Sequence, residues 1–216
     1  WQVYDTPTPN ASNNSVVGYD RYALKPTFDM AAGFYPGSIT LTLSTTEPST
    51  DIRYTTDGSE PDQFSSLYSS PLNINQTTCV RAKCFPQSPM IHYSFTETNT
   101  YFINEQHTFP VLSVASEDFN DLFTNFSVQE IMSSFELFDE NDQFQFEMDG
   151  DFRGHGNDSW AFQQKGIRFY VRDQYGYANK IDYKIFPTSP RTDFDVLIIR
   201  NAGSDNYPGG QPPYRY

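Results

Sequence analysis

The sequence predicts a mainly β protein, in which a β-sandwich of roughly 80 residues is followed by a β-rich α+β domain. Phe, Tyr and Trp make up 17% of the 216 residues, and aromatic side chains suit a pleated, half-buried surface better than a helix. Apolar and polar residues alternate in short runs separated by turn signals that contain Gly or Pro. Together these observations favour strands over helices along most of the chain.

Residues 1–23 differ in composition from the rest of the chain. They are rich in Asn, Ser, Thr and Pro and have no clear periodicity, so we expect an N-terminal arm or linker. The chain begins with Trp1 rather than Met, from which we expect that an N-terminal segment has been removed.

The first domain is predicted from three runs with period two: Ile39, Leu41 and Leu43; Ile52, Tyr54 and Thr56; and Val80, Ala82 and Cys84. Turn signals stand between them at Asp57-Gly58 and Ser70-Pro71. Cys79 and Cys84 flank a continuous strand pattern, and this spacing places their Cα atoms beyond disulfide reach. We expect two thiols, with Cys84 inward and Cys79 near a strand end.

This region also carries a resemblance, in Gly33-Phe34-Tyr35-Pro36-Gly37, in Ile52-Arg53-Tyr54-Thr55-Thr56-Asp57-Gly58-Ser59-Glu60-Pro61, in Tyr68 and Pro71, and in Val80-Arg81-Ala82. These residues resemble the immunoglobulin-like module at the C-terminus of chitobiases and β-hexosaminidases. The resemblance covers residues 24–103. It implies an immunoglobulin-like β-sandwich that serves as an accessory domain of secreted or cell-surface proteins and has no catalytic residues.

The second domain is predicted over residues 104–206. Phe109 to Val114 has the pattern of a buried strand, and Ser116 is a candidate N-cap for a short helix that contains Phe119, Leu122 and Phe123. Phe135 and Leu137 before the polar tetrad 139–142, and Phe144, Phe146 and Met148 after it, predict a hairpin. Three further strands are expected around Ile167, Phe169 and Val171; Ile181, Tyr183 and Ile185; and Phe194, Val196 and Ile198.

Charge limits the possible partners. The chain has 27 Asp and Glu residues against 14 Lys and Arg, a net charge of −13, whereas a protein that binds a phosphate backbone needs a basic surface. Residues 117–151 carry 11 acidic residues and no basic ones. We therefore expect no nucleic-acid partner. No apolar run approaches the ~18 residues needed to cross a bilayer, so no membrane span is expected either.

One group of residues suggests phosphate chemistry. Gly154 and Gly156 precede a strand, and Lys165 has the same parity as the apolar residues of that strand, so its side chain is expected to point inward. Glycines let a backbone approach a phosphate closely, and a neighbouring ammonium can meet the α- and β-phosphates. A tight hairpin loop with a Lys at a strand edge explains the same residues without any ligand.

The wider pattern resembles the spore-coat CotH kinase family over residues 108–206. The matching pieces are Phe109-Pro110-Val111-Leu112-Ser113, Gly154-x-Gly156 with Ser159, Gln164-Lys165-x-x-Arg168, Tyr175-Gly176, Tyr183-x-x-Phe186 and Leu197-Ile198-Ile199-Arg200-Asn201-Ala202-Gly203-x-Asp205. The resemblance implies the N-terminal half of that fold. It gives Lys165 the nucleotide-binding role, places Gly154, Gly156 and Ser159 over the phosphates, and leaves Arg168 and Asp205 as supporting charges.

The sequence also departs from that family. The family's metal-binding and catalytic carboxylates lie downstream on a second lobe, whereas this sequence ends in a Pro/Gly/Tyr-rich tail at residues 207–216. Phosphoryl transfer depends on positioning and on charge neutralisation by metal. We therefore expect no cofactor, with ATP and Mg²⁺ required only under the kinase alternative.

Other chemistry is weakly indicated. The acidic residues between Asp139 and Asp151 lack the EF-hand spacing, which favours a solvated hairpin tip over a Ca²⁺ site. His92, His107 and His155 show no ligand spacing, so no metal site is expected. Paired carboxylates for glycoside hydrolysis stay possible, because their separation in space decides that chemistry.

Five Asn-x-Ser/Thr sequons occur, at Asn10, Asn13, Asn75, Asn125 and Asn157. They favour an N-glycosylated protein that is extracellular or at the cell surface, although a chain rich in Asn, Ser and Thr also produces sequons by chance. A glycan on Asn157 would obstruct nucleotide entry.

The sequence therefore favours an extracellular structural or adhesive surface protein. It would associate with other copies of itself, as in a filament, or with other extracellular surface proteins. The alternative is an atypical CotH-type protein kinase.

Overall fold

The computed structural model describes residues 3–4, 18–118, 120–124, 130–156, 165–176 and 178–200. Contacts divide the chain into two compact units, of which the first comprises residues 1–113 with 136–145 and the second residues 114–135 with 146–216. The first unit thus extends beyond residue 103, where the sequence pattern ends the first domain. The fold is mainly β, as predicted, and the described residues contain a single α-helix of four residues.

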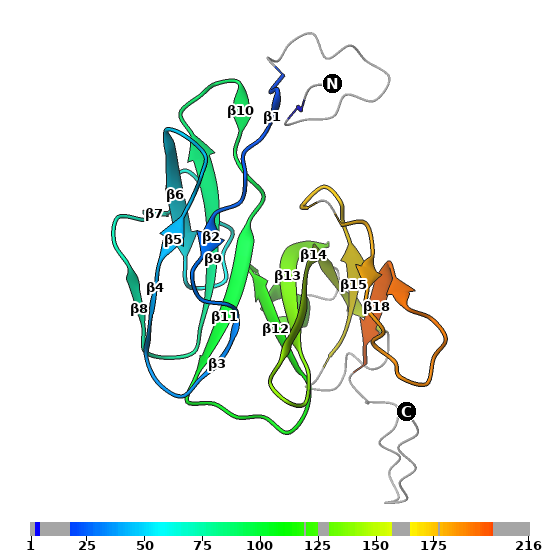
Figure 1. Cartoon of the computed structure of the whole chain (residues 1–216). Helices are drawn as coiled ribbons and strands as arrows, with labels where there is room; N and C mark the ends of the chain where they lie inside the picture. The colour runs from blue at the N-terminus through cyan, green and yellow to red at the C-terminus, as the bar shows by residue number, and fades with distance from the viewer. Residues whose placement is uncertain are drawn as a thin grey trace, which may run out of the picture. The chain divides into compact units, whose positions relative to one another are not determined.

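The first unit is a β-sandwich (Figure 1). One sheet has the strand order β3-β11-β9-β6-β7, and the pairs β4-β8, β2-β5 and β1-β10 complete the unit. The strands are β1 (Arg21–Tyr22), β2 (Thr27–Phe28), β3 (Gly33–Tyr35), β4 (Ile39–Leu41), β5 (Leu43–Ser44), β6 (Thr50–Thr55), β7 (Ser66–Leu67), β8 (Leu72–Ile74), β9 (Thr78–Pro86), β10 (Ile91–His92) and β11 (Glu97–Ile103).

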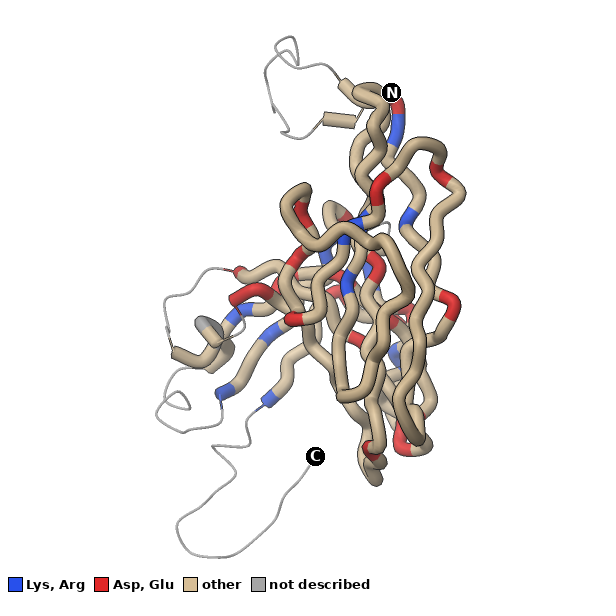
Figure 2. The backbone as a smooth tube through the Cα atoms, turned by 90° about the vertical axis from the view of Figure 1, so that its left-hand side faces the viewer, with Lys and Arg blue, Asp and Glu red and all other residues tan. Residues whose placement is uncertain are grey.

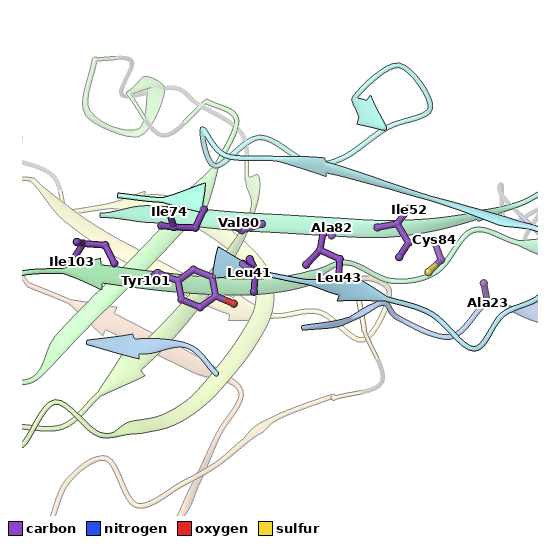
Figure 3. Close-up of a cluster of buried hydrophobic side chains, with 10 residues drawn as sticks. All are labelled: Ala23, Leu41, Leu43, Ile52, Ile74, Val80, Ala82, Cys84, Tyr101 and Ile103. Atoms are coloured by element: carbon purple, nitrogen blue, oxygen red, sulfur yellow. The ribbon is translucent and has the colours of Figure 1, made fainter. Parts of the chain in front are cut away.

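The predicted alternation builds the core of this unit. Val80, Ala82 and Cys84 of β9 are fully buried, and Leu41 and Leu43 lie in the same cluster. Figure 3 shows these side chains in a row with Ile52, Ile74, Tyr101 and Ile103. Both cysteines are thiols on β9, with Cys79 half-buried near the strand start and Cys84 inward, as expected.

The predicted strand through Ile39, Leu41 and Leu43 is interrupted. Its first part, β4, pairs with β8, and its second part, β5, pairs with β2. At the break, the backbone N–H of Thr42 donates to Asp29 Oδ1 at 2.7 Å, and the Thr42 carbonyl accepts from the Asp29 N–H at 3.1 Å. This exchange of partners keeps Leu41 and Leu43 on the buried face while the strand changes neighbours.

Most residues of a five-stranded sheet with the order β12-β13-β14-β15-β18 belong to the second unit, together with the separate pair β16-β17 and helix α1. The bounds are β12 (Val111–Ser116), α1 (Asp121–Thr124), β13 (Ile131–Phe138), β14 (Phe144–His155), β15 (Gly166–Val171), β16 (Ile181–Asp182), β17 (Asp193–Phe194) and β18 (Val196–Ile199). Aromatic rings fill the core on one face of this sheet: the Phe135 and Phe169 ring centroids are 4.6 Å apart, and those of Phe152 and Phe169 are 4.9 Å apart.

The predicted hairpin is present as β13 and β14. The Asp139 carboxylate holds its turn, because Oδ1 accepts hydrogen bonds from the backbone N–H groups of Asn141 at 2.8 Å and Gln143 at 3.0 Å. Asp142 has a φ of 61°, a conformation that Asp tolerates better than most residues. The polar tetrad therefore forms the turn itself.

Three local predictions were wrong. Ser116 is the last residue of β12, not a helix N-cap, and its hydroxyl donates to the Met132 carbonyl at 3.0 Å. Phe109 precedes β12 and is 77% exposed. Val196 and Ile198 are exposed although Phe194 is buried, because the chain leaves β17 at Phe194 and enters a different sheet at Val196, which reverses the alternation.

Among the residues described, no helix is long and apolar enough to cross a membrane.

Candidate functional site

The structure locates four of the five residues predicted to contact a nucleotide. Gly154 lies in β14 opposite Ile167, Gly156 directly follows that strand with a φ of 112°, and Lys165 directly precedes β15 and is half-buried. Arg168 lies within β15. All four are near one end of the β14-β15 pair. Ser159, like Asp205, is outside the described residues.

The register of β14, β15 and β18 decides which side chains share a face. Arg153 is opposite Arg168, which in turn is opposite Ile198. Two residues further along β14, His155 is opposite Gly166, and two residues earlier Asp151 is opposite Tyr170. Successive residues of a strand point to opposite faces, so these side chains lie on the other side of the sheet from Phe152 and Phe169. We call Arg153, His155, Arg168 and Tyr170 the basic face.

Arg168 is held on the basic face by neutral partners. Its Nη2 lies 2.9 Å from His155 Nδ1, and its Nη1 donates to the Tyr170 hydroxyl at 3.0 Å. Its Nε is buried and has no hydrogen-bond partner within the described structure. Burial lowers the pKa of His155, and the charges of Arg168 and Arg200 lower it further. His155 is therefore neutral near pH 7, and its Nδ1 accepts the hydrogen bond.

Within the part of the chain that the structure describes, no carboxylate pairs with the two arginines of the basic face. Arg153 is exposed and, like Arg168, forms no ion pair with the residues described. Two like charges directly opposite each other on a sheet destabilise it. Arg172 gives a contrast: its Nε is 2.7 Å from Asp151 Oδ2 and its Nη2 is 2.7 Å from Glu130 Oε2. Figure 2 shows basic positions on neighbouring strands of the second unit.

This arrangement suits an anion. Guanidinium groups present several N–H donors in a fixed plane and bind carboxylate, sulfate or phosphate oxygens in pairs. Sequence reasoning found Arg168 but missed Arg153 and His155, because it tested histidines only against metal-ligand spacings. The available signal was Arg153-x-His155 on one strand and Arg168 on the strand that pairs with it.

In the first unit, the motif that carries the chitobiase resemblance forms a structural turn. The Thr55 hydroxyl donates to the Ser59 carbonyl at 2.7 Å, and Asp57 Oδ1 accepts from the Ser59 N–H at 3.1 Å. Gly58, with a φ of 87°, lets the chain reverse. Its carbonyl accepts a hydrogen bond from Arg81 Nη1 at 3.1 Å.

Arg81 then links this turn to the sheet. Its side chain is 1% exposed, and its Nη2 lies 2.6 Å from Glu60 Oε2, whose other oxygen is 2.5 Å from Lys83 Nζ. Burial opposes the charged form of Glu60, but attraction to Arg81 and Lys83 together with hydrogen bonds from Lys83 and Thr96 outweighs it, so the pKa of Glu60 is lowered. The Glu60 carboxylate pairs with these two cations and accepts a hydrogen bond from Thr96, so its role is to hold the turn against the sheet. The motif residues therefore secure the sandwich.

Of the five sequons, only Asn75 lies in the described residues, where it is exposed in the turn between β8 and β9. Asn10, Asn13, Asn125 and Asn157 lie outside them.

Comparisons with known proteins bear on the first unit alone. No curated protein and no solved structure matched the chain. The comparisons also gave no evidence for a CotH kinase domain. Residues 30–92 match the family model of the chitobiase/beta-hexosaminidase C-terminal domain, in agreement with the β-sandwich and with the resemblance carried by its turn motif.

Proposed function

We propose that this chain is an extracellular structural or adhesive surface protein and that the basic face is a contact surface for an acidic partner. The observation that carries the proposal is the pairing of Arg153 with Arg168, for which the described residues supply no carboxylate partner, in a chain whose net charge is −13. Arg153 and Arg168 repel each other across the strand pair, and a partner of opposite charge would offset that repulsion.

Another copy of the chain supplies such a partner. Residues 117–151 carry 11 acidic residues and no basic ones. Glu136 and Asp151 among them are buried, whereas Glu140 in the hairpin turn at Asp139–Gln143 is exposed. A contact between this segment of one copy and the basic face of the next joins two different surfaces. A contact between two different surfaces can repeat from copy to copy. It produces an open filament when the rotation that relates successive copies does not close a ring.

Self-association is tested by analytical ultracentrifugation at about 50 mM and about 500 mM NaCl. We expect association at low salt and monomers at high salt, because salt screens exposed charges. Arg168→Glu should abolish association at low salt. Lys184→Glu, which changes an exposed residue outside the basic face by the same charge, should not. Equal behaviour of the two variants would contradict the proposal.

The extracellular location has separate support. The Asn75 sequon is exposed in a turn, where an oligosaccharide can be attached without displacing the core. We further propose that the other sequons, Asn10, Asn13, Asn125 and Asn157, are acceptors. Intact mass before and after N-glycosidase treatment of protein from its natural source should differ by the mass of the glycans. An unchanged mass would argue against secretion through a glycosylating pathway.

A CotH-type kinase is the second candidate. It is supported by the position of Gly156, with its positive φ, at the end of the β14-β15 pair where Lys165 and Arg168 lie. In that case Lys165 and Arg168 would contact the phosphates of ATP, and Gly154, Gly156 and Ser159 would cover them. Under our first proposal, Mg²⁺-ATP should leave the melting temperature unchanged.

A ligand at 100 times its dissociation constant stabilises a fold by about 2.7 kcal/mol. A clear Mg²⁺-ATP shift that is lost in Lys165→Ala would therefore favour the kinase.

A further inference from the structure

A short loop between β6 and β7 presents an aromatic side chain in a fixed position. Asp62 Oδ1 accepts hydrogen bonds from the backbone N–H groups of Phe64 at 2.8 Å and Ser65 at 2.7 Å, and from the Ser65 hydroxyl at 2.8 Å. In return, the Asp62 N–H donates to the Ser65 hydroxyl at 2.9 Å. Arg53 Nη1 holds the Ser65 carbonyl at 2.8 Å. The loop is therefore anchored on both sides of Phe64.

Phe64 itself is 83% exposed, the highest exposure among the large apolar side chains described. A phenyl ring in water forgoes the ~2 kcal/mol or more that its burial would contribute. The loop does not need this ring, because its hydrogen bonds come from Asp62, Ser65 and the backbone. An anchored and exposed ring is the arrangement expected when the ring packs against a ligand.

Phe64 borders an open groove of about 670 Å³, within the usual range for ligand sites. Tyr54 of β6, Ser66 of β7 and Asn73 of β8 also line it, as does Thr56. β7 and β8 lie on the same side of the sandwich in Figure 1. Within the described residues, the side chains of Thr56, Ser66 and Asn73 form no hydrogen bond, so their donors and acceptors are available to a ligand.

The chemistry of this groove matches one class of ligand. A sugar ring has an apolar C–H face that packs on an aromatic ring and a rim of hydroxyl groups that donate and accept hydrogen bonds. The groove offers the exposed ring of Phe64 together with hydroxyl and amide groups, which both donate and accept. The described residues that line it include no cation, and their one acidic side chain, Asp57, is already bonded to Ser59. An uncharged ligand fits better than an anion.

We propose that the groove between β6, β7 and β8 binds a neutral carbohydrate chain, with Phe64 as the stacking platform and Thr56, Ser66 and Asn73 as hydrogen-bonding groups. This site is on the first unit and is independent of the basic face. If no carbohydrate binds the groove, the proposed role of the basic face is unaffected. If the basic face mediates no association, the carbohydrate proposal is likewise unaffected.

The test is isothermal titration calorimetry of the full chain with three hexasaccharides, built of β-1,4-linked glucose, N-acetylglucosamine or mannose. Protein produced without glycosylation is used at high salt, so that neither a glycan on Asn75 nor self-association contributes. We expect at least one hexasaccharide to bind. Phe64→Ala should weaken that binding by about tenfold, the loss expected for one aromatic contact. Asn73→Ala should weaken it as well.

Phe109→Ala is the matched control, because Phe109 is also highly exposed, at 77%, but does not line the groove. It should bind like the unmodified chain. Near-ultraviolet circular dichroism of each variant checks that the fold is kept. Absence of binding by all three hexasaccharides would overturn the proposal, and so would equal affinity of Phe64→Ala and Phe109→Ala.

Discussion

Glu136 is the most unusual single residue of the first unit. It is 1% exposed, its Oε1 accepts a hydrogen bond from the Thr100 N–H at 3.0 Å, and its Oε2 accepts one from the Thr100 hydroxyl. Burial raises its pKa to about 7, since it outweighs the two hydrogen bonds from Thr100, and the negative charge of Glu97 adds to the increase. The sequence did not single this residue out, because a period-two pattern through Phe135 and Leu137 assigns the Glu between them to the solvent face.

Glu136 predicts a loss of stability as pH rises. Its pKa is higher in the folded than in the unfolded state, where it is near 4.5. The folded state therefore binds the proton more tightly, and stability is lost between about pH 4.5 and pH 7. The difference of about 2.5 units corresponds to ~3 kcal/mol at most. Glu136→Gln should remove this loss, which urea unfolding at pH 5 and pH 8 measures. Glu140→Gln, at the exposed hairpin turn, should keep the slope of the unmodified protein.

Glu47 predicts the opposite pH dependence. It accepts hydrogen bonds from Arg21 Nη1 at 2.9 Å and from the Leu24 N–H at 3.1 Å, and the bonds to Arg21 lower its pKa to about 2. The folded pKa lies below the unfolded value, so this stabilisation is present above pH 4.5 and is lost as pH falls toward 2. Because the Arg21 side chain is 48% exposed, we expect Glu47→Gln to cost only about 1 kcal/mol at pH 7. Unfolding of the variant in urea at pH 7 and pH 3 should show a larger deficit at pH 7 than at pH 3.

At the scale of elements, period-two patterns located strands well but not the points where strands change partners. The β13-β14 hairpin was predicted, because two alternating runs enclose a polar turn. The predictions failed at Thr42 and between Phe194 and Val196, where pairing passes from one strand to another, and at Ser116, which ends β12 instead of capping a helix. Such exchanges depend on contacts between distant residues, which a local pattern does not contain. The same reason explains why Arg168 was found but its neighbours on β14 were not.

Gly150 in β14 is predicted to be essential for the second unit. A Cβ atom at this position would lie 2.1 Å from the Tyr170 carbonyl oxygen and 2.5 Å from Phe169 Cζ. Neither atom can withdraw easily, because one belongs to the paired backbone and the other to a fully buried ring. Gly150→Ala should therefore destabilise the protein by several kcal/mol, on the order of 3 or more.

Gly37→Ala is the control for this substitution, since a Cβ there meets no atom within 4 Å. Its melting temperature should stay within about 2 °C of the unmodified protein. If differential scanning calorimetry gave both variants the same melting temperature, the packing around Gly150 would be looser than the structure indicates.

At the scale of the whole molecule, the net charge of −13 predicts that salt stabilises the folded monomer. Like charges repel in the compact state, and added ions screen that repulsion. At a protein concentration low enough to keep the chain monomeric, the melting temperature should rise between about 10 mM and about 300 mM NaCl. Glycerol at equal osmolarity is the control: it carries no charge, so a rise in melting temperature that NaCl gives and glycerol does not is due to screening of charge. A falling melting temperature would mean that attractive surface pairs, such as Lys180 with Asp193, outweigh the net repulsion.

The first unit is discontinuous, since residues 136–145 belong to it together with residues 1–113. The ring centroids of Phe34 and Phe102 lie 5.6 Å and 5.3 Å from that of Phe138, and Thr100 donates to Glu136. During synthesis from the N-terminus, these groups emerge from the ribosome before their partners exist. A nascent chain that has reached residue 113 thus holds every strand from β1 to β11 while two aromatic rings still lack Phe138. Completion of the sandwich must wait until the hairpin has emerged, so the translation rate over residues 114–145 sets how long this apolar surface is open to chaperones or to another nascent chain.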